Sequence, residues 1–235
     1  MNVLIACEES QTVCKAFRER GHRAFSCDLV PCSGGHPEWH IQGDALQLIN
    51  GNCTFTTADT HTHTQAGPWD LLIAHPPCTF LSNAGAVRLY PQAGKLDLDR
   101  YAEGMKAKEF FLLFLAADCE RICIENPIPS SVFDLPHCSQ VIQPYDFGEP
   151  WSKKTFLWLK GLPPLEPTQR VKNWKPYVSC GTSANKGNKD KAGASRAGGD
   201  KKVRSTTFPG IAAAMAEQWG GGYQAAQLSL FGGIK

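Results

Sequence analysis

Short apolar runs that end abruptly in polar residues are the feature that most constrains the fold of this chain. Residues 2–7 form one such run, and the segment after it places Val13, Ala16 and Phe17 at helical spacing. A second run, residues 22–28, ends in an acid. A strand, a helix and a second strand within about thirty residues predict a βαβ unit and therefore a parallel sheet.

Later segments continue this alternation. Residues 69–74 are continuously apolar, as expected for a strand that is covered on both faces of a sheet. We also expect a helix over 100–118, strands over 121–126 and 155–159, and a final helix over 208–220 that begins at Pro209 and ends at Gly220. The predicted fold class is α/β, with a mostly parallel, doubly wound sheet.

The composition fits one large globular domain with a proper core. Of 235 residues, 42% are hydrophobic and 20% are charged, and no segment approaches the ~18 consecutive apolar residues of a membrane span. The ten cysteines lack both an export signal and zinc-ligand spacing. We therefore expect reduced thiols, no metal site and a cytoplasmic location.

Residues 165–207 differ from the rest of the chain. They carry ten Lys or Arg and three acids, a local charge of +7, whereas the whole chain is +2 and the remainder is therefore −5. Residues 183–202 show no apolar period, which predicts a solvated irregular segment. A basic irregular insertion is also suited to holding a phosphate backbone.

Polar or reactive groups follow four of the predicted strands. They are Cys7 to Glu9, Asp28, His75 to Cys78, and Glu125 to Pro127. Taken singly, each acid could be a helix cap or a surface charge. Ligands of open parallel sheets bind beyond the carboxyl ends of the strands, so the four sets together predict a functional site there.

Cys78 and Glu125 are the pair with the most chemistry. A thiolate is a strong nucleophile, and a carboxylate near an aromatic nitrogen can donate or accept a proton. A cysteine after a strand is often an inert core residue. Pro76 and Pro77 favour the reactive alternative, because proline fixes φ and makes the turn stiff, so the next side chain is presented in one orientation.

These residues carry a resemblance to a known family. "HPPC" and "IENP" resemble the catalytic signatures of DNA cytosine-C5 methyltransferases, and "VLIACEESQ", "GDALQL", "YDFGEPWSKKTFLWL" and "TTFPGIAAAMAEQW" resemble its other motifs in the right order. The chain is still more similar to short cytosine-methyltransferase-like proteins of phages and prophages, along nearly its whole length. This resemblance implies a bacterial or phage-infected cell and association with the nucleoid.

The resemblance implies a Rossmann-like, class I S-adenosylmethionine-dependent methyltransferase fold and a double-stranded DNA substrate. By this resemblance Cys78 would add to C6 of a cytosine flipped out of the duplex, and Glu125 would hydrogen-bond the ring near N3. C5 would then take a methyl group from S-adenosylmethionine. Lys153 stands in place of the first arginine of a later motif, where it could steady the cytosine or a phosphate.

The resemblance also implies binding residues. Those for the cofactor are Ala6, Cys7, Glu8, Glu9, Ser10, Asp28, Leu29, Asp44, Ala45, His75 and Pro76, and those for the substrate are Pro77, Thr79, Asn126, Pro127 and Lys154. Four features depart from the family pattern: residues 7–11 contain no glycine, Thr79 replaces a glutamine, Thr155 replaces an arginine, and His75 replaces a glycine.

A second motif lies near the end of the chain. Gln227, Leu228, Ser229, Leu230 and Phe231 resemble the peptide with which bacterial replication and repair proteins bind the sliding clamp. Such a peptide places leucine and phenylalanine side chains in an apolar groove. The other interpretation is a terminal segment that packs on its own domain.

We therefore expect a catalytic core over 1–164, a DNA-contacting insertion over 165–207, a completing helix over 208–222 and a flexible tail over 223–235. The favoured function is DNA cytosine-5 methylation with recruitment by the clamp. Two alternatives stay open: an enzyme that adds a different group to a pyrimidine or acts on a free nucleotide, and a non-enzymatic protein that binds DNA or the clamp.

Overall fold

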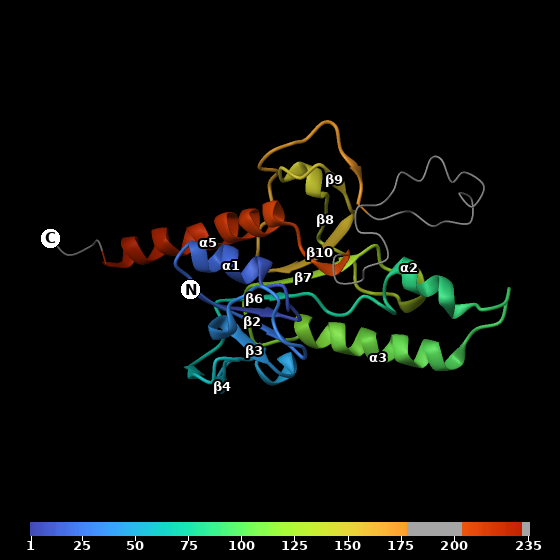
Figure 1. The fold of residues 1–235 in the computed structure, drawn as a ribbon, viewed down its shortest axis with the longest axis horizontal. Coiled ribbons are helices and arrows are strands. Elements are labelled where there is room, and N and C mark those ends of the chain that lie inside the picture. Colours follow the sequence, from blue (N-terminus) through green and yellow to red (C-terminus); the bar gives the residue numbers. More distant parts are fainter. Residues whose placement is uncertain (178–203, 232–235) are drawn as a thin grey trace.

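The computed structural model describes residues 1–177 and 204–231, and for residues 222–231 it describes the backbone only. Its centre is a seven-stranded sheet of order β3-β2-β1-β6-β7-β10-β8 (Figure 1). β10 runs antiparallel to β7 and β8, and the other pairs are parallel. The strands are β1 (Asn2–Ala6), β2 (Arg23–Asp28), β3 (His40–Gln42), β6 (Leu71–Ala74), β7 (Ile122–Pro127), β8 (Gln140–Ile142) and β10 (Thr155–Lys160). The predicted α/β class with a Rossmann-like, mostly parallel sheet is confirmed.

Helices cover both faces of this sheet. α1 (Thr12–Glu19) and α5 (Pro209–Phe231) lie on one face, and α3 (Leu98–Leu115) lies on the other (Figure 1). The side chains of β1 alternate between two apolar cores, as a strand buried on both faces requires. Other helical segments include the short helix α2 (Asn83–Ala86) and the 3-10 turns Pro37–Trp39, Ala45–Gln47, Val87–Leu89, Ser131–Phe133 and Pro144–Asp146.

Two small ribbons stand outside the main sheet. β4 (Cys53–Thr56) and β5 (Thr62–Gln65) form an antiparallel hairpin. β9 (Trp151–Ser152) pairs in parallel with β11 (Lys175–Pro176), which belongs to the insertion expected to contact DNA. Residues 165–177 of that insertion are described, whereas 178–203, which include the lysine- and glycine-rich stretch, lie outside the described residues.

Every strand expected from the apolar runs is present, within two residues of its predicted ends. The sequence did not indicate β3 and β8, because each has only three residues and lies at an edge of the sheet, where an apolar period cannot develop. The two small ribbons were also not predicted. Their strands are largely polar or very short, and the partner strands define them more than their own sequence does.

The expectation that Gly220 ends the last helix is wrong, because α5 continues to Phe231. A Cβ atom at Gly220 would lie 2.5 Å from Nε2 of His22, so the glycine allows the helix to approach that side chain. The backbone of residues 227–231 therefore continues α5, while the side chains of the clamp-like motif (Gln227, Leu228, Ser229, Leu230 and Phe231) lie outside what the structure describes. Within the described residues, no helix is both long enough and apolar enough to span a membrane.

Candidate active site

The strand ends that the sequence predicts to carry the functional site lie along one edge of the sheet. β2, β1, β6 and β7 are adjacent and parallel, so their carboxyl ends face the same way. Ala6 pairs with Cys27 on one side and with Ala74 on the other, and the backbone N–H of His75 donates to the carbonyl of Ala6 over 2.9 Å. Residues from four separate segments are thereby placed beside one another at the expected ligand-binding edge.

A pocket opens beside Glu125 at this edge. It is small and partly open to solvent, with a cavity volume of about 10 Å³, which is room for about one water molecule. Its wall combines one carboxyl group, one ammonium group and two hydroxyl groups with apolar side chains from residues 208–215. The lining residues are Glu125, Lys153, Thr155, Thr207, Phe208, Ile211 and Met215.

Glu125 is a buried carboxylate that is hydrogen-bonded to His75. The two atoms that meet, Nδ1 of His75 and Oε2 of Glu125, are 3.3 Å apart, and the side chains are only 9% and 11% exposed. Burial alone would raise the pKa of Glu125, but the hydrogen bond from His75 and the charge of Lys153 outweigh it, so this pKa lies below its ordinary value. The pocket therefore holds Glu125 ionised at neutral pH.

Cys78 lies on a turn that is tied to the end of β7. The Ser82 N–H donates to the carbonyl of Cys78 over 3.0 Å. The Asn83 N–H donates to the Ile128 carbonyl over 2.7 Å, and the Ser130 N–H donates to the Leu81 carbonyl over 2.8 Å. These bonds fix the backbone around the thiol, so the stiffness inferred from the two prolines has a tertiary component as well.

The environment of Cys78 favours the neutral thiol in the free protein. Burial raises its pKa, the negative charge of Glu125 raises it further, and the positive charges of Lys153 and Arg204 lower it. Cys78 is thus within electrostatic reach of both other proposed catalytic residues. A nucleophilic step would require the thiol to lose its proton when the substrate arrives.

The predicted substrate-binding residues are spread around this centre. Pro77, Thr79 and Lys154 are exposed, and Pro127 pairs with Thr155 across the β7–β10 register. Asn126 is fully buried, and neither amide atom of its side chain has a hydrogen-bond partner among the described residues. A buried amide left in this state costs free energy, so Asn126 marks a place where a loop or ligand can add a partner.

Glu8, predicted to bind a cofactor, is committed to the start of α1. Its Oε1 accepts from the Val13 N–H over 2.6 Å and its Oε2 from the Cys14 N–H over 3.2 Å, and the residue is 4% exposed. Burial raises the pKa of Glu8, while His75 and these two backbone bonds lower it in part. Its carboxyl group occupies the backbone donors that a helix N-terminus would otherwise offer to an anion.

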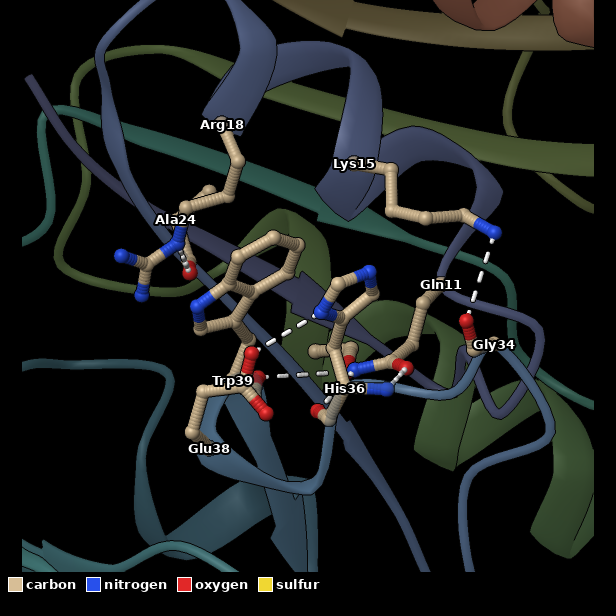
Figure 2. Close-up of polar contacts among 9 residues, drawn as sticks. Gln11, Lys15, Arg18, Ala24, Gly34, His36, Glu38 and Trp39 are labelled. Carbon is tan, nitrogen blue, oxygen red and sulfur yellow. Dashed lines mark hydrogen bonds and ion pairs between the residues drawn. The ribbon is translucent and has the colours of Figure 1, made fainter.

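The other residues of this first loop hold the connection between β2 and β3. Glu9 accepts from Ser33 through its side chain over 2.5 Å and through its carbonyl over 2.8 Å. Figure 2 shows Gln11 directed into that connection, where its side chain donates to the carbonyl of His36 over 2.8 Å and accepts from the His36 N–H over 3.0 Å. A Cβ at Gly34 would lie 2.5 Å from the Cβ of Gln11, so only glycine fits at this crossing.

The acids after β2 and β3 lie near the end of β1. Burial raises the pKa of Cys7 above its ordinary range, and the charges of Asp28, Cys27 and Asp44 raise it further. Asp28 accepts from the Val30 N–H over 3.2 Å, and Asp44 accepts from the Leu46 N–H over 3.0 Å. Beside them Leu29 is 73% exposed, whereas Ala45, Ala6 and Pro76 are buried and Ser10 is half-buried.

The structure also adds residues that the sequence did not single out. Thr207 and Phe208 line the pocket from the residues just before α5. Gln11 holds the connection between β2 and β3, and the charge of Arg204 lowers the pKa of Cys78. "SGGH" indicates a turn, but the pattern of residues does not show which loop the turn contacts.

The comparisons with known proteins give distant similarities in fold. No protein-family model matches the chain, and no curated protein matches it. Solved structures that are similar to it include a prophage-encoded E. coli protein provisionally assigned as a DNA modification methyltransferase (13% identity, TM-score 0.40, covering 73% of this chain and 52% of that one). Another is the Entamoeba histolytica methyltransferase EhMeth (14% identity, TM-score 0.42, covering 73% of this chain and 57% of that one). A third is the S. pombe Dnmt2 methyltransferase (13% identity, TM-score 0.37, covering 75% of this chain and 52% of that one).

This chain thus spans between 52% and 57% of the length of those structures. At such identities and TM-scores, the activities in their names do not carry over to this chain.

Proposed function

We propose that this protein is an S-adenosylmethionine-dependent DNA methyltransferase that acts at C5 of a cytosine through a covalent Cys78 adduct. The observation that supports this most directly is the site around Glu125: a buried, ionised carboxylate lines a small pocket together with Lys153, and both charges act on the thiol of Cys78. A nucleophile and a ring-binding carboxylate are the two groups that pyrimidine activation requires.

In this mechanism the cytosine leaves the duplex, because its C6 cannot be reached within the stack. The proton of Cys78 passes to the ionised carboxylate of Glu125, Lys153 and Arg204 stabilise the thiolate, and Sγ forms a bond to C6. The protonated Glu125 then donates its proton to N3, so the electron pair of the ring's 5,6 double bond becomes available at C5. After alkylation, the C5 proton passes to solvent, the bond between Sγ and C6 breaks, and the N3 proton returns through Glu125 to the thiolate, which restores the ring and the free thiol.

The residues at the ends of β2 and β3 fit the nucleoside part of the proposed cofactor. Asp28 offers a carboxylate to a ribose diol, and the exposed side chain of Leu29 offers an apolar surface to a purine. The donors at the start of α1 are taken by Glu8, so the carboxylate of the cofactor would need other partners. When bound, S-adenosylmethionine supplies an electrophilic methyl group.

We also propose the remaining partners on the basis of the sequence. Residues 165–207 would contact the DNA backbone, and residues 227–231 would bind the sliding clamp. The division into core, insertion, completing helix and tail belongs to the same proposal. Deletion of residues 227–231 should abolish binding to the clamp in a pull-down and leave activity on short duplexes unchanged. Retained clamp binding would refute the assignment of the motif.

The catalytic proposal is tested by trapping. Duplex DNA containing 5-fluorocytosine should form a stable covalent adduct with the wild-type protein in the presence of S-adenosylmethionine, because fluorine cannot leave C5 as the proton does. Cys78→Ser should form none. Cys138→Ser, another partly exposed free thiol, should form as much adduct as wild type. No adduct with wild type, or an adduct with Cys78→Ser, would rule out the C5 mechanism.

A second function is favoured by Glu8. Because this side chain fills the helix N-terminus, the same thiol and carboxylate could serve the transfer of a different group to a pyrimidine. Mass spectrometry of nucleosides from DNA of expressing cells separates the two: one added methyl group supports the first function, and any other added mass supports the second. A non-enzymatic DNA- or clamp-binding role requires that the protein binds no S-adenosylmethionine in calorimetry.

A further inference from the structure

A small structured surface lies beside the pocket, formed by the residues just before β10 and by part of the segment that follows it. We call it the basic ribbon and define it as residues 151–154 and 170–177. The pairing of β9 with β11 sets Lys175 opposite Trp151, and the N–H groups of Lys175 and Tyr177 donate to the carbonyls of Pro150 and Ser152 over 2.9 and 3.1 Å. This part of the insertion therefore has a fixed backbone, which in Figure 1 arches beyond β9.

The most exposed aromatic side chain of the ribbon is Trp174. It is 45% exposed and is stacked on Tyr145, with ring centroids 5.0 Å apart and planes 14° from parallel. The Val171 N–H, which donates to the Tyr145 carbonyl over 2.8 Å, anchors the segment to the residue on which Trp174 rests. One face of the indole is thus supported by Tyr145, and the ring is held in place for a flat partner on its other face.

Aromatic contacts connect this surface to the pocket. Trp151 meets Tyr177 at 5.7 Å, and Tyr177 meets Phe208 at 4.7 Å, both edge to face. Phe208 lines the pocket next to Glu125, with the ammonium of Lys153 5.8 Å from its ring centroid. A DNA strand whose target base lies at Glu125 can therefore continue along the ribbon.

The charge of the ribbon is positive. Arg170 forms an ion pair with Asp146 at 3.2 Å. The exposed ammonium groups of Lys154, Lys172 and Lys175 form no ion pair within residues 1–177 and 204–221, where side chains are described. Three free cations around a stacking surface are suited to a polyanion with flat groups, since phosphates bind the lysines and bases stack on the ring.

We propose that the basic ribbon binds an unpaired DNA strand next to the target base, with Trp174 stacked on an unpaired base and the three lysines on phosphates. The proposal rests on the proposed function in one respect, that DNA is the substrate. Within a duplex both faces of each base are covered by its neighbours, so an exposed indole can stack only on an unpaired or terminal base. The ribbon should therefore favour single-stranded or locally opened DNA over a closed duplex.

Fluorescence anisotropy tests this without any cofactor or turnover. A labelled short single-stranded oligonucleotide and a blunt duplex of the same sequence are titrated with wild-type protein, Trp174→Ala, Trp174→Phe and the control Lys106→Gln on α3, which is distant from the ribbon in sequence and structure (Figure 1). Trp174→Ala should weaken single-strand binding about fivefold to 150-fold, the range of one base stack, and duplex binding less than about twofold. Trp174→Phe and Lys106→Gln should remain close to wild type.

Salt titrations test the lysines. Lys172→Gln and Lys175→Gln should each reduce the slope of log affinity against log salt for the single strand by about 0.7. Unchanged urea midpoints show that the variants are folded. The proposal is overturned if wild type binds no single strand, if Trp174→Ala binds it like wild type, or if Trp174→Ala weakens single strand and duplex equally. If Cys78 forms the covalent adduct but Trp174→Ala does not weaken single-strand binding, only the proposal for the ribbon is refuted. If Trp174→Ala weakens single-strand binding but Cys78 forms no adduct, only the proposed methyl transfer is refuted.

Discussion

Replacement of His75 by alanine should change the pH dependence of stability in a specific direction. In the native protein the hydrogen bond from His75 helps to hold the pKa of Glu125 below its ordinary value. A carboxylate with a lowered native pKa stabilises the fold above its unfolded pKa, and this contribution disappears as the pH falls through the native pKa. Without His75, burial dominates and the pKa of Glu125 should rise, so that ionisation then opposes folding.

The magnitude follows from the geometry of the pair. Both side chains are about nine-tenths buried, and the 3.3 Å bond has an ionised acceptor. Such a bond contributes about 1.5–3 kcal/mol. The variant should therefore be destabilised by about that amount at neutral pH, beyond the constant cost of the cavity. Near pH 4, where Glu125 is largely protonated in the variant, the difference should shrink towards the cavity cost.

Urea unfolding of both proteins at a series of pH values measures this difference. His75→Asn is the matched control, because its amide can place a donor near the position of Nδ1, and its loss of stability should be smaller. Since Lys153 also faces Glu125, Lys153→Met in the same background should enlarge the effect. A difference between wild type and His75→Ala that is constant with pH would refute the reasoning, because His75 would then act through packing alone.

Three further predictions concern other parts of the site and fold. Glu8→Ala should lower the free energy of unfolding by about 1–3 kcal/mol in urea titrations, since two buried N–H groups lose their acceptor, and a change below about 0.5 kcal/mol would contradict this. Gly220→Ala should destabilise the protein by about 1–3 kcal/mol, because the added methyl group overpacks the contact with His22. Gly221→Ala has open space around its Cβ position and should stabilise the protein by roughly 0.5–1 kcal/mol. Equal shifts of the two variants in thermal melting temperature would refute this contrast. Because the charge of Lys153 lowers the pKa of Cys78, Lys153→Met should move iodoacetamide alkylation of Cys78 to higher pH, and an unchanged pH profile would show that the two groups do not interact.

Patterns among residues close together in the sequence were sufficient to predict the fold class of the protein. Apolar runs such as residues 69–74 predict buried parallel strands, and a parallel sheet places all strand ends of one kind at one edge. For this reason the sequence alone places Cys78 and Glu125 in one site. The paired prolines indicated a stiff turn, because proline restricts φ wherever it occurs.

The partners of individual side chains could not be predicted in this way. Glu8 follows a strand like the other acids, but the close approach of α1 places two backbone donors against its carboxyl group. Gly220 has the sequence signature of a helix end, yet α5 continues through it, and the missing side chain lets the helix approach His22.

The sequence by itself therefore determined the α/β fold class, and it predicted the edge at which ligands would bind and the two residues proposed for the chemistry. Only the tertiary structure decided that His75 is hydrogen-bonded to Glu125, that Phe208 lines the pocket from a segment distant in sequence, and that Trp174 stacks on Tyr145. The physical reason is the range of the interactions. Strand and turn preferences act between near neighbours in the chain, whereas these contacts join segments that meet only after the sheet and its helices have packed.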